Sequence, residues 1–428
     1  MNAIATRRLG YDVAVVGGGP GGATTAAFLA RSGFSVVLYE RELFPRFHIG
    51  ESLLPAMLPL LDRLGVHETV AERGFQVKYG AMFSDQEMNL EQTYYFLRDR
   101  AWPNYSYQVP RADFDQILLE HARKSGVDVR QPATVDQVSF DADGVVVSGT
   151  EDERAFTTRA AFLVDASGRD GFVTARRGRR DRVPNLGKVA LFAHFRGAHR
   201  LSGIDEGNIR IHVFEDGWFW WIPLSGDLTS IGCVLHARTV RQHAEAIEDL
   251  LQTMIGRCRR VAAGLQSAER VTPVRTAANF AYVNRPVIGD RFLAVGDAVA
   301  FVDPIFSGGV FIAMKSGELA AEAIGAALRD GRFEKRRFRR YERHVWRGVT
   351  PFFRFIHKYY EPAFLELFLK PSNRLGMFES VLMVLSGGAF DGLTWPRRLA
   401  LEVLFTSARI NVWRRRRAGQ AVESRLEW

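Results

Sequence analysis

Residues 11–22 read YDVAVVGGGPGG, a short β-branched run that leads directly into a glycine-rich turn. The run predicts a buried strand, and the alanines that recur at helical spacing over residues 20–32 predict a helix immediately after it. Gly33 stands where a helix C-cap belongs, and residues 34–40 have the composition of a second strand. A strand, a helix and a strand at this spacing form a βαβ unit, which implies parallel strands joined by a right-handed crossover.

Gly17, Gly19 and Gly22 occupy the GxGxxG pattern at the junction of strand and helix. In this pattern the first glycine permits a tight turn, the second lets a pyrophosphate approach the backbone, and the third lets the helix pack on the strand. Glu40 ends the second strand 21 positions after Gly19, where a carboxylate can accept hydrogen bonds from a ribose. An acid at this position favours an unphosphorylated adenosine ribose, so we expect NAD or FAD.

The choice between NAD and FAD rests on motifs further along the chain. Asp297 lies in a Val-Gly-Asp-Ala segment that follows an apolar stretch, and residues 164–169 read VDASGR. Arg46 and Ser52 precede the first sheet-like segment, and Arg111 precedes a predicted helix. All of these segments resemble the FAD-dependent aromatic hydroxylase superfamily. The resemblance implies that FAD is the cofactor, that the Gly-Asp motif binds its ribityl or pyrophosphate region, and that the two arginines and the serine also bind it.

Three further motifs resemble the flavin-dependent halogenases, a family within this superfamily. Residues 218–223 read WFWWIP and match WxWxIP, and residues 301–309 read FVDPIFSGG and match FxxPxxSxG. Lys78 falls where that family carries its catalytic lysine. Residues 47–52, FHIGES, resemble the branch that acts on phenols or on carrier-tethered pyrroles and tyrosines. The resemblance extends to about residue 350 and covers the tail only loosely.

The resemblance implies that reduced FAD, dioxygen and chloride or bromide give a hypohalous acid, which Lys78 directs at an electron-rich aromatic ring. Lys78 shares one face of an alternating stretch with Gln76 and Gly80. Burial of that face would lower the pKa of the lysine and make its neutral amine accessible. An ordinary exposed strand lysine is the alternative.

The halide is expected at the start of a long helix predicted over residues 310–329. The resemblance implies that the backbone N–H groups of Gly308 and Gly309 form an anion nest there, and that Gly309 also lets the flavin ring approach closely. The alternative is that both glycines only admit the ring. The family usually has Ser or Thr after Ser307, so Gly308 departs from its pattern.

Trp218 and Trp220 share one face of a predicted strand. The resemblance implies that they form a wall between flavin and substrate that only a small oxidant can pass, and core packing is the alternative. Phe306 is expected to act with them in gating the substrate. Tryptophan halogenases carry a glutamate at this position, so Phe306 favours the phenol and carrier branch over the tryptophan branch.

The pattern along the chain predicts an α/β protein with a Rossmann-like FAD-binding domain, an inserted antiparallel β-sheet domain for the substrate, and a C-terminal helical region. Alternating apolar and polar residues over 75–83, 94–109 and 188–238 predict the antiparallel sheet. The expected limits are 1–72, 111–178 and 276–350 for the FAD-binding domain, 73–110 and 179–275 for the sheet domain, and 351–428 for the helical region.

The chain has 428 residues and 57 Lys and Arg against 48 Asp and Glu, which gives a formal net charge of +9. Much of the positive excess lies in residues 335–347 and 414–417. These clusters are either a solvated helix face with a frayed tail or a landing surface for an acidic protein or an anionic membrane. Nucleic acid is not expected as a partner, because no recognition module accompanies the charge.

The hydrophobic fraction of 47% excludes a disordered chain, and two isolated cysteines, Cys233 and Cys258, exclude a disulfide framework. Residues 1–19 lack the apolar core of a signal peptide, and no stretch approaches about 18 uninterrupted apolar residues. We therefore expect a cytoplasmic protein of a reducing compartment, without a metal site or a transmembrane segment, for which peripheral membrane contact is possible.

These features together predict a two-component FAD-dependent halogenase that acts on a phenol or pyrrole, either free or tethered to an acidic acyl or peptidyl carrier protein. No second nucleotide fingerprint for NADPH is found, so a separate flavin reductase is expected to supply reduced FAD. Two other enzymes are alternatives: an aromatic hydroxylase that consumes NADPH itself, and an isoprenoid-type double-bond reductase. An alternative of another class is a non-catalytic flavoprotein that its arginine-rich ends recruit to membranes.

Overall fold

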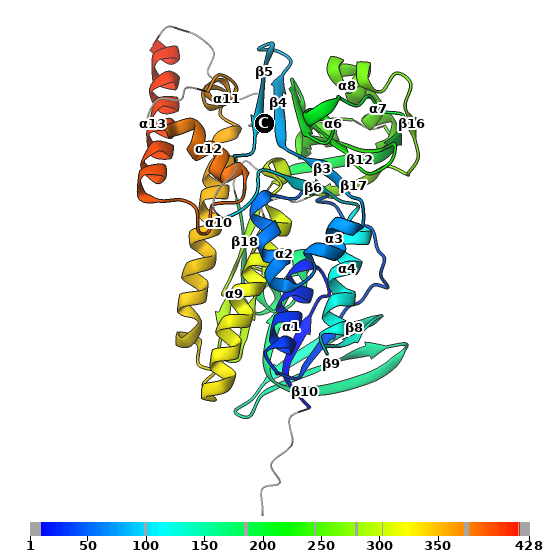
Figure 1. The fold of residues 1–428 in the computed structure, drawn as a ribbon, viewed down its shortest axis with the longest axis vertical. Helices are drawn as coiled ribbons and strands as arrows, with labels where there is room; N and C mark the ends of the chain where they lie inside the picture. The colour runs from blue at the N-terminus through cyan, green and yellow to red at the C-terminus, as the bar shows by residue number, and fades with distance from the viewer. Residues whose placement is uncertain are drawn as a thin grey trace, which may run out of the picture.

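The computed structural model describes residues 10–97, 101–183, 187–243, 245–278, 281–301, 303–371, 376–417 and 419. Figure 1 shows a nucleotide-binding region around α1 in the lower half, a second sheet above it, and a group of helices at the upper left. The long helices α9 and α10 run beside one another and connect the lower region to the helical group. The three regions that the sequence predicts are therefore present.

Six strands of the eight-stranded first sheet have the order β19-β20-β10-β1-β2-β7, and all of these six except β19 run parallel. Its strands are β1 (Tyr11–Val16), β2 (Val36–Tyr39), β7 (Asp128–Arg130), β10 (Arg154–Asp165), β19 (Ile288–Gly289) and β20 (Phe292–Ala294). The helices α1 (Pro20–Arg31), α4 (Arg111–Lys124) and α9 (Gly309–Asp330) pack together on one face, over Val13 and Val15. The predicted βαβ unit and Rossmann-like fold are confirmed.

The close approach of α9 to α1 depends on a glycine. A Cβ on Gly317 of α9 would lie 2.7 Å from the carbonyl oxygen of Gly21 in α1. The opposite face of the sheet is covered by strands, because β8 (Ala133–Phe140) and β9 (Val145–Glu151) form an antiparallel layer with β10 over Ala14 and Val16. The first domain therefore has helices on one face and an antiparallel ribbon on the other.

The second sheet has the strand order β16-β12-β15-β14-β13-β4-β5, and β17 also pairs with β12. Its strands are β4 (Gly80–Asp85), β5 (Leu90–Tyr95), β12 (Lys188–Arg196), β13 (Ile209–Phe214), β14 (Gly217–Pro223), β15 (Leu228–His236), β16 (Glu269–Arg270) and β17 (Arg275–Ala278). The predicted antiparallel sheet is confirmed for every pair except β13 and β4, which run parallel. The expectation is wrong for that pair, because β4 joins the sheet from a distant part of the chain.

All seven residues of β14 are buried. Trp218 and Trp220 pack in the large core that faces the first domain, whereas Phe219 and Trp221 pack in a separate cluster. That cluster lies under α7 (Ile247–Arg257) and α8 (Arg259–Gly264), which follow α6 (Ala237–Gln242). The strand alternation that the sequence predicts for the tryptophan motif therefore separates two hydrophobic cores.

The C-terminal region consists of α10 (Arg339–Tyr359), α11 (Pro362–Leu369), α12 (Met377–Leu385) and α13 (Trp395–Arg417). The predicted limit between residues 350 and 351 falls inside α10, and the limit between 275 and 276 falls inside β17. The domain limits stay a prediction. In the part of the chain that the structure describes, no helix is both long and apolar enough to cross a membrane.

Short elements connect these regions. They are α2 (Leu58–Leu64), α3 (His67–Glu72), α5 (Thr174–Arg177), β3 (Gln76–Lys78), β6 (Ser106–Gln108), β11 (Arg179–Arg182), β18 (Tyr282–Arg285) and β21 (Ala300–Phe301). β3 pairs with β6, and β18 pairs with β11 and β21. The two-stranded sheet of β3 and β6 carries Lys78 and lies at the junction of the two large sheets.

The indole of Trp220 packs directly over Gly232 of β15, which has no side chain to obstruct it. A Cβ on Gly232 would lie 2.1 Å from Cζ2 of Trp220. Gly232→Ala should displace the indole and lower the free energy of unfolding by about 1–3 kcal/mol, the range for overpacking a core, as measured by urea denaturation. Gly256→Ala is the matched control, because that helical glycine has no atom within 4 Å of an added Cβ and should not lose stability. An unfolding free energy that does not change in Gly232→Ala would contradict this account of the packing.

Candidate functional site

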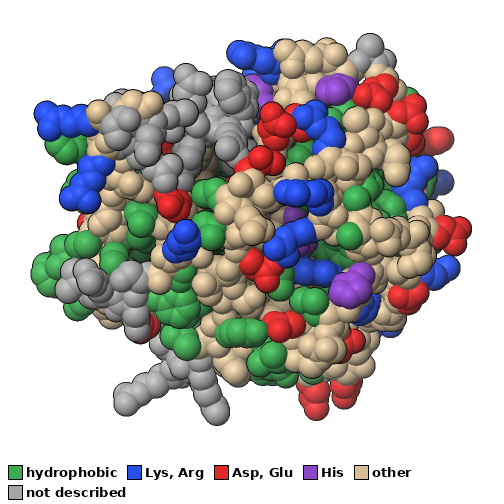
Figure 2. Space-filling view, turned by 90° about the horizontal axis from the view of Figure 1, so that it is seen from above, with side chains coloured by type: hydrophobic (Ala, Val, Ile, Leu, Met, Phe, Trp, Pro, Cys, Tyr) green, Lys and Arg blue, Asp and Glu red, His purple; other side chains and the backbone are tan. Residues whose placement is uncertain are grey.

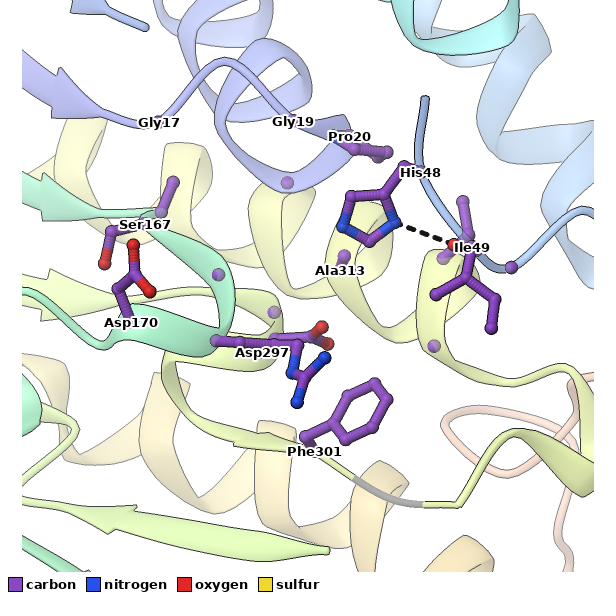
Figure 3. A pocket seen from close by; sticks show the side chains of 18 of the residues that line it. Gly17, Gly19, Pro20, His48, Ile49, Ser167, Asp170, Asp297, Phe301 and Ala313 are labelled. Carbon is purple, nitrogen blue, oxygen red and sulfur yellow. Dashed lines mark hydrogen bonds between the residues drawn. The ribbon is translucent and has the colours of Figure 1, made fainter. Parts of the chain in front are cut away.

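A cavity of about 880 Å³ lies beyond the carboxyl ends of the parallel strands and reaches the face of the second sheet that carries the tryptophan motif. Figure 3 shows its glycine turn, His48 and Asp297 on different sides of the space. Ten predicted site residues line it: Gly17, Gly19, Glu40, Arg46, Ser52, Arg111, Trp218, Trp220, Asp297 and Gly309. Four do not: Gly22, Lys78, Phe306 and Gly308. The structure thus brings together motifs that are almost 300 residues apart in the sequence.

The glycine turn has the close contacts that the GxGxxG pattern requires. Gly17 has φ of +107°, and a Cβ there would lie 2.2 Å from the carbonyl oxygen of Ala166. A Cβ on Gly22 would lie 1.9 Å from the carbonyl oxygen of Gly17, so the third glycine serves helix packing and does not face the cavity. Gly19 and Pro20 line the cavity at the start of α1. The N-terminus of a helix presents free N–H groups and a positive dipole, which suits a pyrophosphate.

Glu40 follows β2 and is buried at the edge of the cavity. Its Oε2 accepts a hydrogen bond from the N–H of Gly18 at 2.7 Å, and its Oε1 accepts one from the N–H of Glu42 at 2.9 Å. Each carboxylate oxygen can accept two hydrogen bonds, so both can still bind ribose hydroxyls. The two backbone contacts fix the carboxylate in the position that ribose recognition needs.

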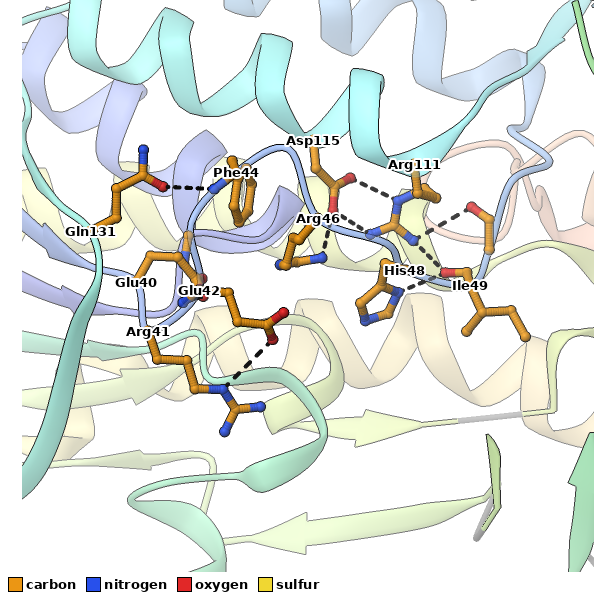
Figure 4. A network of polar contacts seen from close by, with 12 residues as sticks. Glu40, Arg41, Glu42, Phe44, Arg46, His48, Ile49, Arg111, Asp115 and Gln131 are labelled. Atoms are coloured by element: carbon orange, nitrogen blue, oxygen red, sulfur yellow. Dashed lines mark hydrogen bonds and ion pairs between the residues drawn. The ribbon is translucent and has the colours of Figure 1, made fainter. Parts of the chain in front are cut away.

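A buried carboxylate orients both predicted arginines (Figure 4). Asp115 of α4 accepts hydrogen bonds from Nε and Nη2 of Arg111 at 2.7 and 2.8 Å, and one from Nη1 of Arg46 at 3.3 Å. Arg111 also donates to the carbonyl oxygen of Ile49 at 2.6 Å, which anchors the loop before Ser52. Asp115 is not among the predicted site residues. The spacing of four residues between Arg111 and Asp115 in a predicted helix is the signal that could have revealed it.

His48 and Asp297 face the cavity from opposite sides (Figure 3). Burial, with Arg111 nearby, lowers the pKa of His48 to about 4, so the imidazole is neutral at pH 7. Burial raises the pKa of Asp297 to about 7, although Arg111 and Arg169 act in the opposite direction. Among the described residues no hydrogen bond reaches the carboxyl of Asp297, so its oxygens are available to hydroxyl groups of a bound cofactor. His48 and Arg169 were not among the predicted site residues.

Lys78 is almost fully buried, with 1% of its surface exposed, and lies behind the cavity wall. β3 places Lys78 opposite Ser106 of β6, and Ser52 forms a bridge with Gln108 of the same strand. The Nζ of Lys78 donates a hydrogen bond to Oγ of Ser52 at 2.7 Å, and Ser52 lines the cavity. The Nζ also lies 5.3 Å from the ring centre of Phe96. Burial lowers the pKa of Lys78 to about 7, so neutral amine is accessible at neutral pH.

Trp218 and Trp220, the predicted wall between flavin and substrate, are held by hydrogen bonds to other regions of the chain. The Nε1 of Trp218 donates to Oη of Tyr360 at 2.9 Å, and Tyr360 donates to Oδ2 of Asp303 at 2.7 Å. The Nε1 of Trp220 donates to Oγ of Ser230 at 3.2 Å. Burial raises the pKa of Asp303 to about 6, but its bond to Tyr360 stabilises the ionised form. Tyr360, at the end of α10, therefore ties the C-terminal region to two of the predicted motifs.

The segment before α9 explains why glycine follows Ser307. Ser307 adopts a left-handed conformation, with φ of +56°, and lines the cavity together with Gly309. Gly308 points the other way, since a Cβ there would lie 3.0 Å from Cε1 of Phe352 in α10. A Ser or Thr side chain at position 308 would therefore be tight against Phe352, whose ring would have to shift by a few tenths of an ångström. A Cβ on Gly309 would meet no atom within 4 Å, so the start of α9 is open towards the cavity.

Phe306 lies in an aromatic cluster and not at the cavity. The members of this cluster that contact its ring are Phe83, Phe355, Tyr359 and Phe368. Most of these contacts are edge-on or tilted, which is the favourable arrangement for aromatic rings. The cluster joins β4 to α10 and α11, so Phe306 connects the FxxPxxSxG segment to the C-terminal helices. Val302 of that segment lies outside the described residues.

Comparison with known proteins agrees with this geometry. A family model described as an FAD binding domain matches residues 10–346. A 1H-pyrrole-2-carbonyl-(peptidyl-carrier protein) chlorinase of Pseudomonas fluorescens is 31% identical over 408 residues, 89% of this chain and 90% of that protein. A tryptophan 2-halogenase of Chondromyces crocatus is 34% identical over 332 residues, 74% of this chain and 61% of that protein. A solved structure of the flavin-dependent brominase Bmp2 has a TM-score of 0.85 at 28% identity, covering 94% of this chain and 99% of that chain.

The chain belongs to the flavin-dependent halogenases. The halogenase therefore uses FAD as its cofactor and chloride or bromide as its halide, as the motifs predict. The alternatives of a hydroxylase, a double-bond reductase and a non-catalytic flavoprotein are not favoured by these relatives. The cavity fits FAD, since it combines the glycine turn, an acceptor for a ribose, and a carboxyl group open to the ribityl chain.

Glu40 should contribute measurably to FAD affinity. Glu40→Ala removes a charged acceptor and is expected to weaken FAD binding by about 1–3 kcal/mol, the range for a lost hydrogen bond to a charged group. Quenching of flavin fluorescence during titration measures the affinity of each variant. Glu72→Ala serves as the control, because that glutamate is exposed on α3 and far from the turn in sequence. Equal FAD affinity of Glu40→Ala and the wild type would assign the ribose contact to another residue.

The buried amine should also make stability depend on pH. The pKa of Lys78 falls from 10.5 to about 7 on folding, so over this interval the unfolded chain binds a proton that the folded chain has released. The free energy of unfolding should therefore rise with pH between about 7 and 10. Lys78→Met should remove this contribution and be at least as stable as the wild type at pH 7.

Denaturant unfolding at several pH values measures this contribution, with Lys124→Met as the control for an exposed lysine. The dependence on pH should be flatter in Lys78→Met than in either the wild type or the control. Parallel curves for all three proteins would show that Lys78 is not held in a low-pKa environment.

Proposed function

We propose that this halogenase transfers chlorine or bromine to a phenol or pyrrole ring carried by an acyl or peptidyl carrier protein, and that Lys78 directs hypohalous acid to that ring. The observation that carries the proposal is the hydrogen bond between Lys78 and Ser52, with the amine buried on one side and the cavity on the other. Bound reduced FAD, with dioxygen and halide, supplies the hypohalous acid.

The residues at the cavity wall have distinct tasks in this proposal. The open start of α9 at Gly309 offers N–H groups and a positive dipole to the halide. Trp218 and Trp220 separate the flavin from the substrate, because both indoles line the cavity and both are fixed by hydrogen bonds. Ser52 marks the point where a small oxidant can leave the cavity and meet the amine of Lys78.

Lys78 suits this task because its surroundings are apolar. The buried Nζ can donate a hydrogen bond to hypohalous acid and polarise the halogen towards a ring, or react with it as a neutral amine. Both forms are accessible near pH 7, since burial brings the pKa of the lysine close to that value. Exclusion of bulk water at this position also keeps the oxidant from escaping.

The substrate class rests on the relatives and on Phe306. The chlorinase from Pseudomonas fluorescens is named for a carrier-bound pyrrole and matches nearly the whole chain. Phe306 lies in an aromatic cluster with Phe83 and Phe355, at the position where tryptophan halogenases carry a glutamate. A free aromatic substrate is the second candidate, which the similarity to a tryptophan 2-halogenase supports.

A flavin reductase is proposed as the second protein of the system. The chain contains one GxGxxG fingerprint, in the turn between β1 and α1. Gly17 and Gly19 of that turn line the cavity that fits FAD. Reduced FAD would then come from a separate NAD(P)H-dependent enzyme. The halogenase alone should not oxidise NADPH, whether or not an aromatic substrate is present.

Mass spectrometry of a substrate panel tests this function. Wild-type protein is given reduced FAD, dioxygen and bromide with free phenols, free pyrroles and the same rings loaded on a carrier protein, and a bromine isotope doublet is expected on a carrier-bound ring. Lys78→Ala should abolish ring bromination while FAD binding persists, and Lys124→Ala should brominate as the wild type does. Bromination that survives in Lys78→Ala would refute the role of Lys78. Brominated products from free rings alone would refute the proposal that the substrate is bound to a carrier protein.

A further inference from the structure

The outer face of α13 carries an unusual row of exposed apolar side chains. Their exposed fractions are 75% for Trp395, 50% for Leu399, 48% for Ile410 and 53% for Trp413. A helix turns by about 100° per residue, so these four positions fall within about 60° of one another. The opposite face is buried against α11 and α12 through Leu401, Leu404, Phe405 and Ala408. We call the exposed row the α13 stripe.

Positive charge borders the α13 stripe on both sides. Arg409 and Arg414 are exposed and lie at positions on opposite flanks of the row, and the guanidinium of Arg417 lies 4.2 Å from the ring centre of Trp413. Glu402 lies within the row, but its carboxylate is paired with Arg354 at 2.8 Å. Figure 2 shows green and blue side chains together at the left edge of the molecule, where α13 lies in Figure 1. The surface therefore combines apolar anchors with exposed positive charge.

The shape and charge of this surface select its partner. A second copy of the same chain would bring the arginines of both stripes together, and like charges disfavour that contact. A membrane-surface helix combines an apolar face with a polar face rich in Lys and Arg, whereas this row is only about 60° wide and includes the exposed, acidic Glu402. A single acidic helix with an apolar ridge matches both properties, because its carboxylates would face the flanking arginines.

We propose that the α13 stripe docks an acidic helix of the carrier protein that delivers the substrate, a proposal that rests on the carrier-bound substrate proposed above. Trp395 and Trp413 are the two anchors, and Arg409 and Arg414 set the orientation of the carrier. The net charge of +9 favours association with an acidic partner, and the local charge of Arg409 and Arg414 would direct that partner to this face.

The inner face of α13 connects the docking surface to the reaction site. Phe405 contacts Phe355 at 6.1 Å between ring centres, and Phe355 contacts Phe306 at 5.0 Å. One ring contact therefore joins α13 to the aromatic cluster, and a second, within the cluster, reaches Phe306.

Steady-state kinetics test the docking surface. The substrates are a peptidyl-carrier protein loaded with 1H-pyrrole-2-carbonyl and the same acyl group on pantetheine alone, both assayed with reduced FAD and bromide. Trp395→Ser with Trp413→Ser, and separately Arg409→Glu with Arg414→Glu, should raise KM for the loaded carrier by about tenfold or more. Both variants should leave turnover of the pantetheine thioester unchanged.

The matched control is Arg339→Glu with Arg340→Glu, which makes the same charge change on exposed residues at the start of α10. It should leave KM for the loaded carrier near the wild-type value. Circular dichroism and thermal unfolding establish that each variant is folded.

Three results would overturn the docking proposal. If the wild type brominates the loaded carrier and both α13 variants keep its KM, the carrier docks elsewhere and the proposed function stands. If the variants keep that KM but lose binding to vesicles of phosphatidylglycerol, the stripe binds membranes instead. If the wild type brominates only free rings, the proposed substrate and the docking site both fail.

Discussion

The hydrogen bond between the Nζ of Lys78 and the Oγ of Ser52 is the contact on which the site depends. It joins two segments that belong to different parts of the fold, since Ser52 lines the cofactor cavity and Lys78 lies on the strand that leads into the second sheet. β6 lies between them and pairs with both, which fixes the distance between amine and cavity. Burial disfavours the ammonium form of Lys78, so a lysine at this position costs folding stability at about pH 7 and below.

A second constraint comes from the C-terminal helices. Tyr360 connects Trp218 of the wall to Asp303 of the segment before α9, and Phe352 fills the space that a side chain at position 308 would need. The helices therefore shape the cavity wall as well as covering it. This explains how Gly308 replaces the usual Ser or Thr without closing the start of α9, because Gly309 remains open to the cavity.

The sequence predicted the features that depend on residues close together in the chain. GxGxxG, the terminal acid Glu40 and the spacing of the strands are sufficient for the βαβ unit, because each acts within about thirty residues. The parallel pairing of β4 with β13 was not predicted, since it depends on segments more than a hundred residues apart. The same holds for Asp115, Tyr360 and His48, whose importance comes from neighbours that only the folded chain supplies. The motif match located Lys78, and its burial behind Ser52 needed the structure.

The most direct measurement is the fate of the oxidant in Ser52→Ala. Wild type and variant receive the same reduced FAD, dioxygen and bromide, with an aromatic substrate and a trap for free hypobromous acid present together. If Ser52 marks the passage to Lys78, the variant should form the same total of oxidised bromine but release more of it to the trap and less to the ring. An unchanged division between ring and trap, at unchanged FAD affinity, would contradict the account.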